Sequence, residues 1–248
     1  AGEQTQPRRC AAGLSAVPAD TSLMTAGLDL RALERRLRTA LTLEVPLTAE
    51  VVNGGKSNLT YRLRSGDRSW VLRRPPLGVR LPTAHDMRRE HTVLRALEKS
   101  KVPVPRVVAT CDDDSVLGAP FYVMEHVNGI VIRGPDDNTL SADEARSCSH
   151  ALVDTLADLH CAPYIELGLS ELGRPEGFMA RQLDRWREQL RRSRVRPLDT
   201  LDCLGDRLAD RVPTNGAAAI VHGDYRIDNV LLASEDPRQI AAVLDWEM

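Results

Sequence analysis

The most informative pattern lies near the C-terminal end, where short apolar runs alternate with polar loops. Residues 220–221 and 230–232 are apolar, and the positions between them are mostly polar. This spacing predicts two buried strands that flank a loop whose polar side chains converge at one point. A further apolar run at 243–244 predicts another strand, which ends at Asp245.

Period-two alternation in the N-terminal half predicts an antiparallel sheet. Residues 59–63 and 70–74 alternate on either side of a turn at 65–67, and residues 104–109 and 121–127 are typical of two more strands. The acidic loop between the last two lacks the glycine and the distal glutamate of a calcium loop, so we interpret it as a solvated turn.

Helical spacing, with apolar residues three and four positions apart, is found in other segments. These segments are residues 28–43, 83–100, 141–159, 175–190 and 198–208. Ser141 with Glu144 predicts a capping box, and Thr83 with Asp86 predicts the start of the second helix. The many arginines on these helices are interpreted as solvent-facing rather than as an anion-binding patch.

Composition narrows the class of protein. The 248 residues are 42% hydrophobic, enough for a sizeable core, and the net charge of −2 gives no global field that would attract nucleic acid or acidic membranes. The five cysteines are odd in number and far apart, which argues for reduced thiols and a cytoplasmic location. No apolar stretch approaches the ~20 residues that cross a bilayer. Residues 1–27 predict a disordered leader, within which Met24 is an alternative start.

Three polar residues in the C-terminal part have the spacing and chemistry that phosphoryl transfer requires. Asp224 precedes Asn229 by five positions, and Asp245 follows the next apolar run. Asp224 can orient and deprotonate an attacking hydroxyl, while the amide oxygen of Asn229 and the carboxylate of Asp245 can hold Mg²⁺. His222 is predicted to brace this loop. Arg226 is predicted to stabilise either the transferred phosphoryl group or an acidic substrate.

The arrangement H-G-D-x-x-x-x-N at residues 222–229, followed by Asp-Trp-Glu at 245–247, resembles the aminoglycoside phosphotransferase and choline kinase superfamily. Within it, the chain is similar to the kinase domains that accompany acyl-CoA dehydrogenases. The resemblance implies an α+β, two-lobed protein-kinase-like fold, with an N-lobe of antiparallel sheet plus helix at 28–127 and a mostly helical C-lobe at 128–248. It also implies further helices beyond Met248, so the C-lobe is expected to be incomplete.

A glycine turn that covers nucleotide phosphates is expected near the start of the predicted sheet. Its candidate residues are Gly54, Gly55, Ser57 and Asn58, and an ordinary hairpin turn is the alternative. A Walker A loop is excluded, because Glu50 stands where that motif needs glycine and a strand follows where it needs a helix.

A cation and an acid complete the predicted nucleotide site. Arg73 takes the place of the kinase lysine, with Arg74 as the adjacent alternative on the opposite face. Glu90 lies on the apolar stripe of its predicted helix, where a carboxylate is costly unless paired. We therefore expect an ion pair between Arg73 and Glu90, and a surface glutamate is the alternative. By resemblance, the backbone from Glu125 to Val127 should meet the adenine edge.

Together these residues predict an enzyme that uses ATP, or GTP, with Mg²⁺ to phosphorylate a hydroxyl group of a small molecule. The resemblance implies a hydroxylated acyl compound as the acceptor. The alternative is a nucleotide-binding pseudokinase or interaction module with little turnover, which the change from lysine to arginine favours. We expect neither a nucleic acid nor a membrane as partner, and a homo-oligomer is left open.

Overall fold

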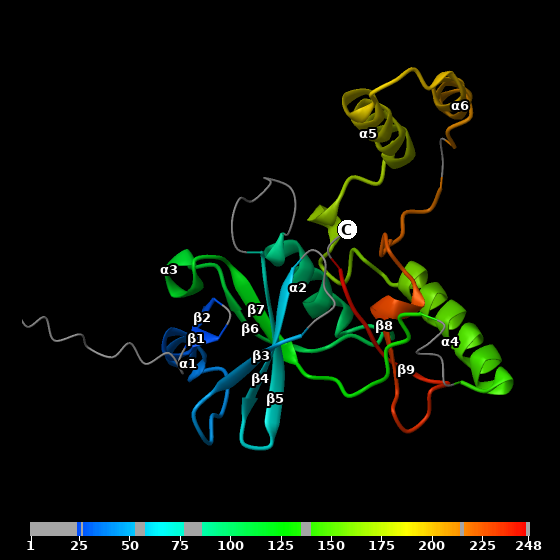
Figure 1. Cartoon of the computed structure of the whole chain (residues 1–248). Coiled ribbons are helices and arrows are strands. Elements are labelled where there is room, and N and C mark those ends of the chain that lie inside the picture. The colour runs from blue at the N-terminus through cyan, green and yellow to red at the C-terminus, as the bar shows by residue number, and fades with distance from the viewer. Residues whose placement is uncertain are drawn as a thin grey trace, which may run out of the picture.

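A five-stranded antiparallel sheet dominates the first half of the chain (Figure 1). The computed structural model describes residues 24–25, 27–52, 58–76, 86–134, 140–213 and 216–246. In sheet order, the strands are β3 (Thr48–Val51), β4 (Leu59–Ser65), β5 (Arg68–Arg74), β7 (Phe121–Glu125) and β6 (Val107–Cys111). Every neighbouring pair is antiparallel, so the predicted sheet is confirmed.

Helices and two small sheets account for the remaining regular secondary structure of the described residues. The helices are α1 (Leu30–Leu37), α2 (Met87–Leu97), α3 (Asp114–Leu117), α4 (Ala142–Cys161), α5 (Phe178–Ser193) and α6 (Asp199–Ala209), with single 3₁₀ turns η3 (Ser170–Leu172) and η4 (Ile227–Asn229). The small sheets pair β1 (Met24–Thr25) with β2 (Leu28–Asp29) and β8 (Val230–Leu232) with β9 (Ile240–Val243). Among the helices that the structure describes, none has the length and apolar character of a transmembrane segment.

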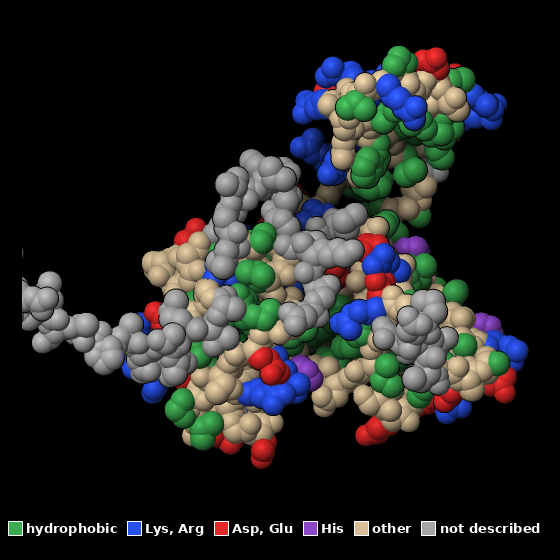
Figure 2. All heavy atoms as spheres, viewed as in Figure 1, with side chains coloured by type: hydrophobic (Ala, Val, Ile, Leu, Met, Phe, Trp, Pro, Cys, Tyr) green, Lys and Arg blue, Asp and Glu red, His purple; other side chains and the backbone are tan. Residues whose placement is uncertain are grey.

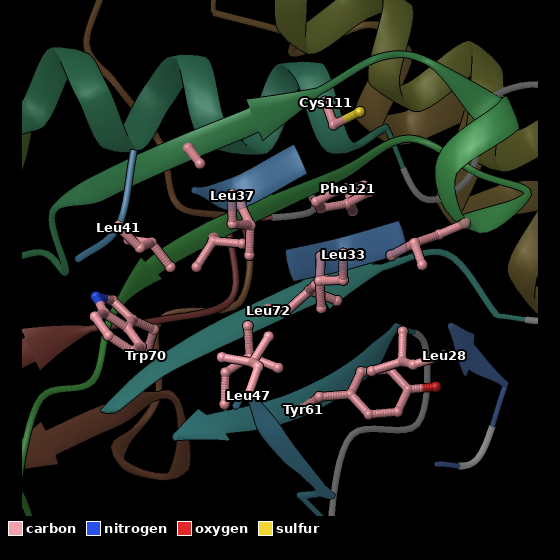
Figure 3. Close-up of a cluster of buried hydrophobic side chains, with 14 of the residues drawn as sticks. Leu28, Leu33, Leu37, Leu41, Leu47, Tyr61, Trp70, Leu72, Cys111 and Phe121 are labelled. Carbon is pink, nitrogen blue, oxygen red and sulfur yellow. The ribbon is translucent and has the colours of Figure 1, made fainter. Parts of the chain in front are cut away.

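Side-chain alternation gives the main sheet two buried faces. Phe121 and Val123 of β7 pack with residues of α1 and α3, whereas Tyr122 and Met124 pack with residues of α2. Figure 3 shows the first cluster, in which leucines of the N-terminal segment lie over the aromatic and leucine side chains of the sheet. The second face carries the residues that matter for the candidate site, because Arg73 and Glu90 lie on it.

The helix predicted for residues 28–43 is shorter than expected. Asp29 caps α1 by accepting a hydrogen bond from the Ala32 amide at 3.0 Å, and the residue before it belongs to β2. The leucine stripe was predicted correctly, since Leu33, Leu37 and Leu41 are all buried, although Leu41 lies beyond the helix end. The predicted leader at 1–27 lies largely outside the described residues.

Two other boundaries also differ from the predictions. The helix predicted from residue 83 begins at Met87, because Asp86 caps it with bonds to two backbone amides; Thr83 lies outside the described residues. The strand predicted for 104–109 begins three residues later, at Val107 of β6, since the proline at 105 has no amide hydrogen to pair with. At Ser141 and Glu144 the predicted capping box is confirmed.

The strand predicted to enter the polar loop is absent. Ile220 is buried, but Val221 is 61% exposed, and neither pairs with a neighbouring strand in the described part of the chain. The strands that do form are β8, directly after the loop, and β9, which pairs with it and contacts α4. The loop is therefore held from its exit side, by the β8–β9 hairpin.

α5 and α6 project away from the rest of the molecule (Figure 1). Apolar side chains at helical spacing along them are largely exposed, including Met179, Trp186 and Leu204. Hydrophobic and basic side chains share this surface (Figure 2).

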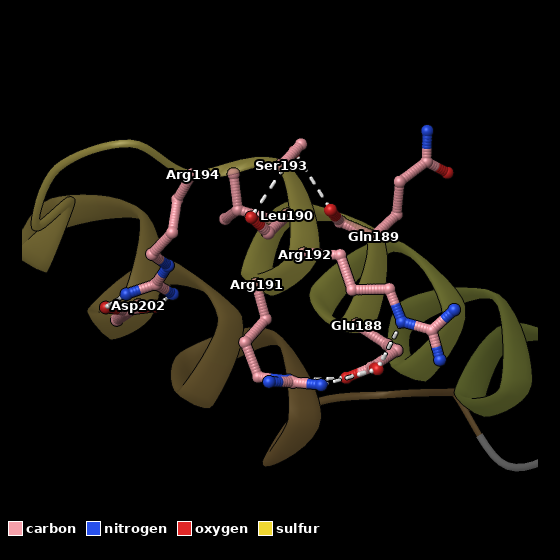
Figure 4. Close-up of polar contacts among 8 residues, drawn as sticks. All are labelled: Glu188, Gln189, Leu190, Arg191, Arg192, Ser193, Arg194 and Asp202. Atoms are coloured by element: carbon pink, nitrogen blue, oxygen red, sulfur yellow. Dashed lines mark hydrogen bonds and ion pairs between the residues drawn. The ribbon is translucent and has the colours of Figure 1, made fainter.

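Several arginines at the C-terminal end of α5 and just after it have local acidic partners. Glu188 accepts hydrogen bonds from Arg191 and Arg192 at 2.7 and 2.6 Å, and Arg194 pairs with Asp202 at 2.6 Å (Figure 4). The two bonds lower the pKa of Glu188 to about 2. Because the guanidinium groups of Arg191 and Arg192 are exposed and locally neutralised, the solvent-facing interpretation is confirmed for these two, whereas Arg194 is half-buried.

One core crosses the predicted boundary between lobes at 127–128. Side chains of α2 and β7 pack in one cluster with Leu159, Val243 and Trp246. The Val243 amide also donates to the Pro103 carbonyl at 2.8 Å. The sequence order of sheet plus helix, followed by a mostly helical part, is that of the predicted α+β fold, while the domain boundary stays a prediction.

Candidate functional site

Arg73 connects the sheet, α2 and the segment after β9. Its Nη1 lies 2.8 Å from Oε1 of Glu90, and its Nη2 donates to Oδ1 of Asp245 at 2.8 Å. The side chain of Glu90 is only 1% exposed, so the predicted ion pair is confirmed and the alternative of a surface glutamate is wrong. Arg74 points to the opposite face, as predicted, and donates to the Gly27 carbonyl at 3.2 Å.

The electrostatics of this cluster favour a permanently charged arginine. Burial alone lowers the pKa of Arg73, but the negative charges around it, chiefly that of Glu90, raise the pKa above its ordinary value. A buried carboxylate without a charged partner would destabilise the folded state by several kcal/mol. Arg73 therefore stabilises Glu90, and Glu90 in turn fixes the position of the guanidinium.

Asp245 has an unusual backbone. Its φ of 66° lies in the left-handed region, and among the described residues no other non-glycine has a positive φ. Such a conformation costs on the order of 1 kcal/mol and persists only where the surroundings impose it. Here the preceding Leu244 amide donates to the Asn229 carbonyl at 2.8 Å, and the following Trp246 indole donates to the Val243 carbonyl at 3.1 Å. The turn therefore directs the Asp245 side chain to Arg73.

The polar loop is held together by Asn229. Its Nδ2 donates both to the main-chain carbonyl of Asp224 and to the Asp224 carboxylate, each at 2.9 Å. Because Asn229 also accepts the bond from Leu244, the loop lies beside the turn that carries Asp245. The structure thus brings together Asp224, Asn229 and Asp245, and their chemical roles stay predictions.

His222 lies beneath the loop with 1% exposure. Its Nε2 is 2.8 Å from the Leu244 carbonyl, and the Asp224 amide donates to its Nδ1 at 3.3 Å, which assigns the hydrogen to Nε2. The ring packs on Trp246 with centroids 4.5 Å apart. Burial lowers the pKa of His222, so the ring is neutral near pH 7. These contacts are those of a residue that braces the loop.

Arg226 lies on the exposed side of the loop. Its Nε is 3.7 Å from Oδ2 of Asp224, and its Nη2 pairs with Asp228. The side chain is 59% exposed, so it is accessible to a ligand that approaches Asp224. Both predicted roles of Arg226 stay open.

The remaining nucleotide-binding candidates are only partly described. Gly54, Gly55 and Ser57 lie outside the described residues, and Asn58, immediately before β4, is buried with 4% exposure. The Glu125 amide donates to the Arg106 carbonyl at 2.9 Å and is therefore used within the protein. The predicted adenine contact rests on the other backbone groups of Glu125 and Val127, and it stays a prediction.

Sequence reasoning missed Tyr122. It is fully buried on β7, directly opposite Arg73 in the β5–β7 register, with its ring 6.2 Å from that of His91. Burial raises the pKa of Tyr122 well above its ordinary value, and the charge of Glu90 raises it further. The buried phenol is therefore neutral and lies close enough to the Glu90 carboxylate to feel its charge. The available signal was the alternation of residues along β7, which places the tyrosine hydroxyl on the sheet face that packs against α2.

An antiparallel sheet carries a buried arginine–glutamate pair, and a mostly helical part follows with a loop in which Asn229 holds Asp224. This combination defines the protein-kinase-like fold class. Residues 48–248 match the family described as "Phosphotransferase enzyme family" (APH), and the chain belongs to this family.

Individual relatives agree with this assignment. The chain is 37% identical over 206 residues to acyl-CoA dehydrogenase family member 11 of Homo sapiens, a match that covers 83% of this chain and 26% of the relative. A candidate aminoglycoside phosphotransferase from Ralstonia eutropha JMP134 superposes with a TM-score of 0.77 at 33% identity, covering 88% of this chain and 64% of the other. The GDP and kanamycin complex of an APH(2″) enzyme has a TM-score of 0.60 at 19% identity, covering 87% and 72%, which shows the fold alone.

Proposed function

We propose that this chain belongs to a nucleotide-dependent phosphotransferase that transfers a phosphoryl group to a hydroxyl of a small molecule. The observation that carries the proposal is the contact between Arg73 and Asp245, which are 172 positions apart in the sequence. It connects the buried pair of the sheet with the loop in which Asn229 holds Asp224. Membership of the phosphotransferase family supports the reaction, and the GDP complex of a structural relative supports a nucleotide donor.

The donor set of this site fits a divalent cation such as Mg²⁺. The amide nitrogen of Asn229 donates to Asp224, so the side-chain oxygen of Asn229 is the atom that would bind a cation. The Asp245 carboxylate is 31% exposed. Among the described residues, no group of three or more His, Cys, Asp or Glu could hold a metal by itself. Mg²⁺ typically uses one or two protein oxygens together with substrate phosphates, which matches this small set. A bound cation would offset the negative charge of the phosphates.

The residues of the chain supply positioning and proton transfer. Asp224 accepts the proton of the acceptor hydroxyl, and the bond from Asn229 keeps its carboxylate oriented for this step. Arg73 donates to nucleotide phosphate oxygens through its planar fork. Arg226, exposed beside Asp224, contacts the transferred group or an acidic acceptor. The donor is ATP or GTP.

A hydroxylated acyl compound is the proposed acceptor. Its support is the similarity to acyl-CoA dehydrogenase family members, in which the matched part is about a quarter of the whole protein. The likeness to aminoglycoside enzymes carries less weight for the acceptor, since pocket residues rather than the fold decide specificity.

A turnover screen tests the proposal. ATP and GTP consumption is measured with hydroxyacyl, aminoglycoside and amino-alcohol acceptors, for the wild type and for Asp224→Asn. We expect acceptor-dependent turnover that falls by about 10²-fold or more in Asp224→Asn, since general-base catalysis contributes on that order. The matched control is Asp236→Asn, because Asp236 pairs with Arg238 in the β8–β9 turn, away from the loop. Nucleotide binding without any turnover that depends on Asp224 would favour the pseudokinase alternative.

A further inference from the structure

The contact between Arg73 and Asp245 uses the same carboxylate that the proposed function assigns to the cation. Nη2 of Arg73 donates to Oδ1 of Asp245 at 2.8 Å. A metal ligand and an ion-pair partner need the same negative charge, and two cations at one carboxylate repel each other. The carboxylate is therefore already engaged before any ligand arrives.

Arg73 cannot simply move away, because its other arm is anchored. Nη1 lies 2.8 Å from Glu90, whose side chain is 1% exposed and belongs to a helix that is packed into the core. The planar fork of arginine can serve two carboxylates at once, whereas the ammonium of lysine is a single point charge. An arginine at this position can therefore contact Glu90 and Asp245 at the same time.

We propose that Arg73 acts as an internal competitor for the cation at Asp245, so that the cation binds well only together with a nucleotide. Phosphate oxygens accept hydrogen bonds from the guanidinium and draw its second arm from Asp245, which frees the carboxylate. Cation and nucleotide binding are then coupled, and each strengthens the other by the same factor. This inference rests on the proposed function for the identity of the cation ligands.

The test is cation binding in the absence of nucleotide, with Mn²⁺ as the probe and the free ion followed by electron paramagnetic resonance. The informative variant is Arg73→Met combined with Glu90→Gln. Glu90, Asp245 and Arg73 together carry one net negative charge, and in the double variant Asp245 alone carries the same charge. A change in affinity therefore reports the freed carboxylate rather than a change in local net charge.

We expect the double variant to bind Mn²⁺ about tenfold or more tightly than the wild type, and the gain to vanish when Asp245→Asn is added. Arg74→Met is the matched control, because this neighbouring buried arginine points to the opposite face and donates to Gly27. Equal affinities of wild type and double variant overturn the proposal, as does an equal gain in Arg74→Met.

A second variant keeps the proposal testable if the double variant does not fold. Arg73→Lys keeps the local net charge and a cation for Glu90 but lacks the second arm that contacts Asp245, so Mn²⁺ should bind more tightly than in the wild type; equal or weaker binding overturns the inference. The proposed function has a separate outcome. If Mn²⁺ binding never depends on Asp245, with or without ADP, both ideas fail, whereas binding that depends on Asp245 without the expected gain overturns only the competition.

Discussion

Removing Arg73 alone should be far more damaging than removing its whole ion pair. Arg73→Met leaves the buried Glu90 carboxylate without its charged partner, and breaking a buried pair in this way costs about 3–5 kcal/mol. Replacing both residues by Met removes the uncompensated charge, so the double variant should be within about 1–2 kcal/mol of the wild type. Against a typical stability of about 5–15 kcal/mol, the single variant would lose a large fraction.

Urea unfolding of the wild type, Arg73→Met, Glu90→Met and the double variant forms a double-mutant cycle, which measures the coupling between the two residues. In thermal unfolding, the single variant should melt about 6–20 °C lower, at about 2–4 °C per kcal/mol for a chain of this size. Arg106→Met is the control, because the Arg106–Glu125 pair is exposed, at 62% and 45%, and should contribute under about 1 kcal/mol. If Arg73→Met cost no more than Arg106→Met, the reasoning from burial would be refuted.

Three further substitutions test other parts of the account. Burial lowers the pKa of His222 below its ordinary 6.5, so at acidic pH the unfolded chain binds more protons than the folded chain. The contribution of the neutral ring to stability is therefore full above about pH 6.5 and is lost as the pH falls. The urea midpoint should decline less between about pH 8 and about pH 5 in His222→Gln than in the wild type, and an equal decline would contradict the pKa shift. Gly129→Ala should destabilise the protein by about 1–3 kcal/mol, because the added Cβ would lie 2.8 Å from a carbonyl oxygen of β8. Gly173→Ala is the control, since no atom lies within 4 Å of the Cβ that it adds. Equal melting temperatures of the two variants would contradict the close approach at Gly129. Tyr122→Phe should cost about 1–3 kcal/mol in the melting assay, because it removes the buried hydroxyl that interacts with the Glu90 carboxylate. A neutral effect would show that the phenol does not support the pair.

The sheet and the ion pair could be predicted because local pattern and burial agree there. Alternation fixed which of Arg73 and Arg74 faces α2, and an acid on an apolar stripe demanded a cation. The strand at 220–221 was mispredicted because two apolar residues do not reveal whether a partner strand is present.

The contacts of the site itself were less accessible from sequence. The bond between Arg73 and Asp245 depends on a left-handed turn at Asp245, and aspartate tolerates that conformation without demanding it. Tyr122 was missed because its role depends on strand register, which no local pattern specifies for β7 against β5.

The most direct test of the central claim is an anomalous difference map from crystals grown with Mn²⁺ and a non-hydrolysable nucleotide. The account predicts a manganese peak bound by the Asn229 side-chain oxygen and the Asp245 carboxylate, with the second arm of Arg73 turned from Asp245 to the phosphates. A nucleotide bound without manganese at these two residues, or manganese held elsewhere, would contradict it.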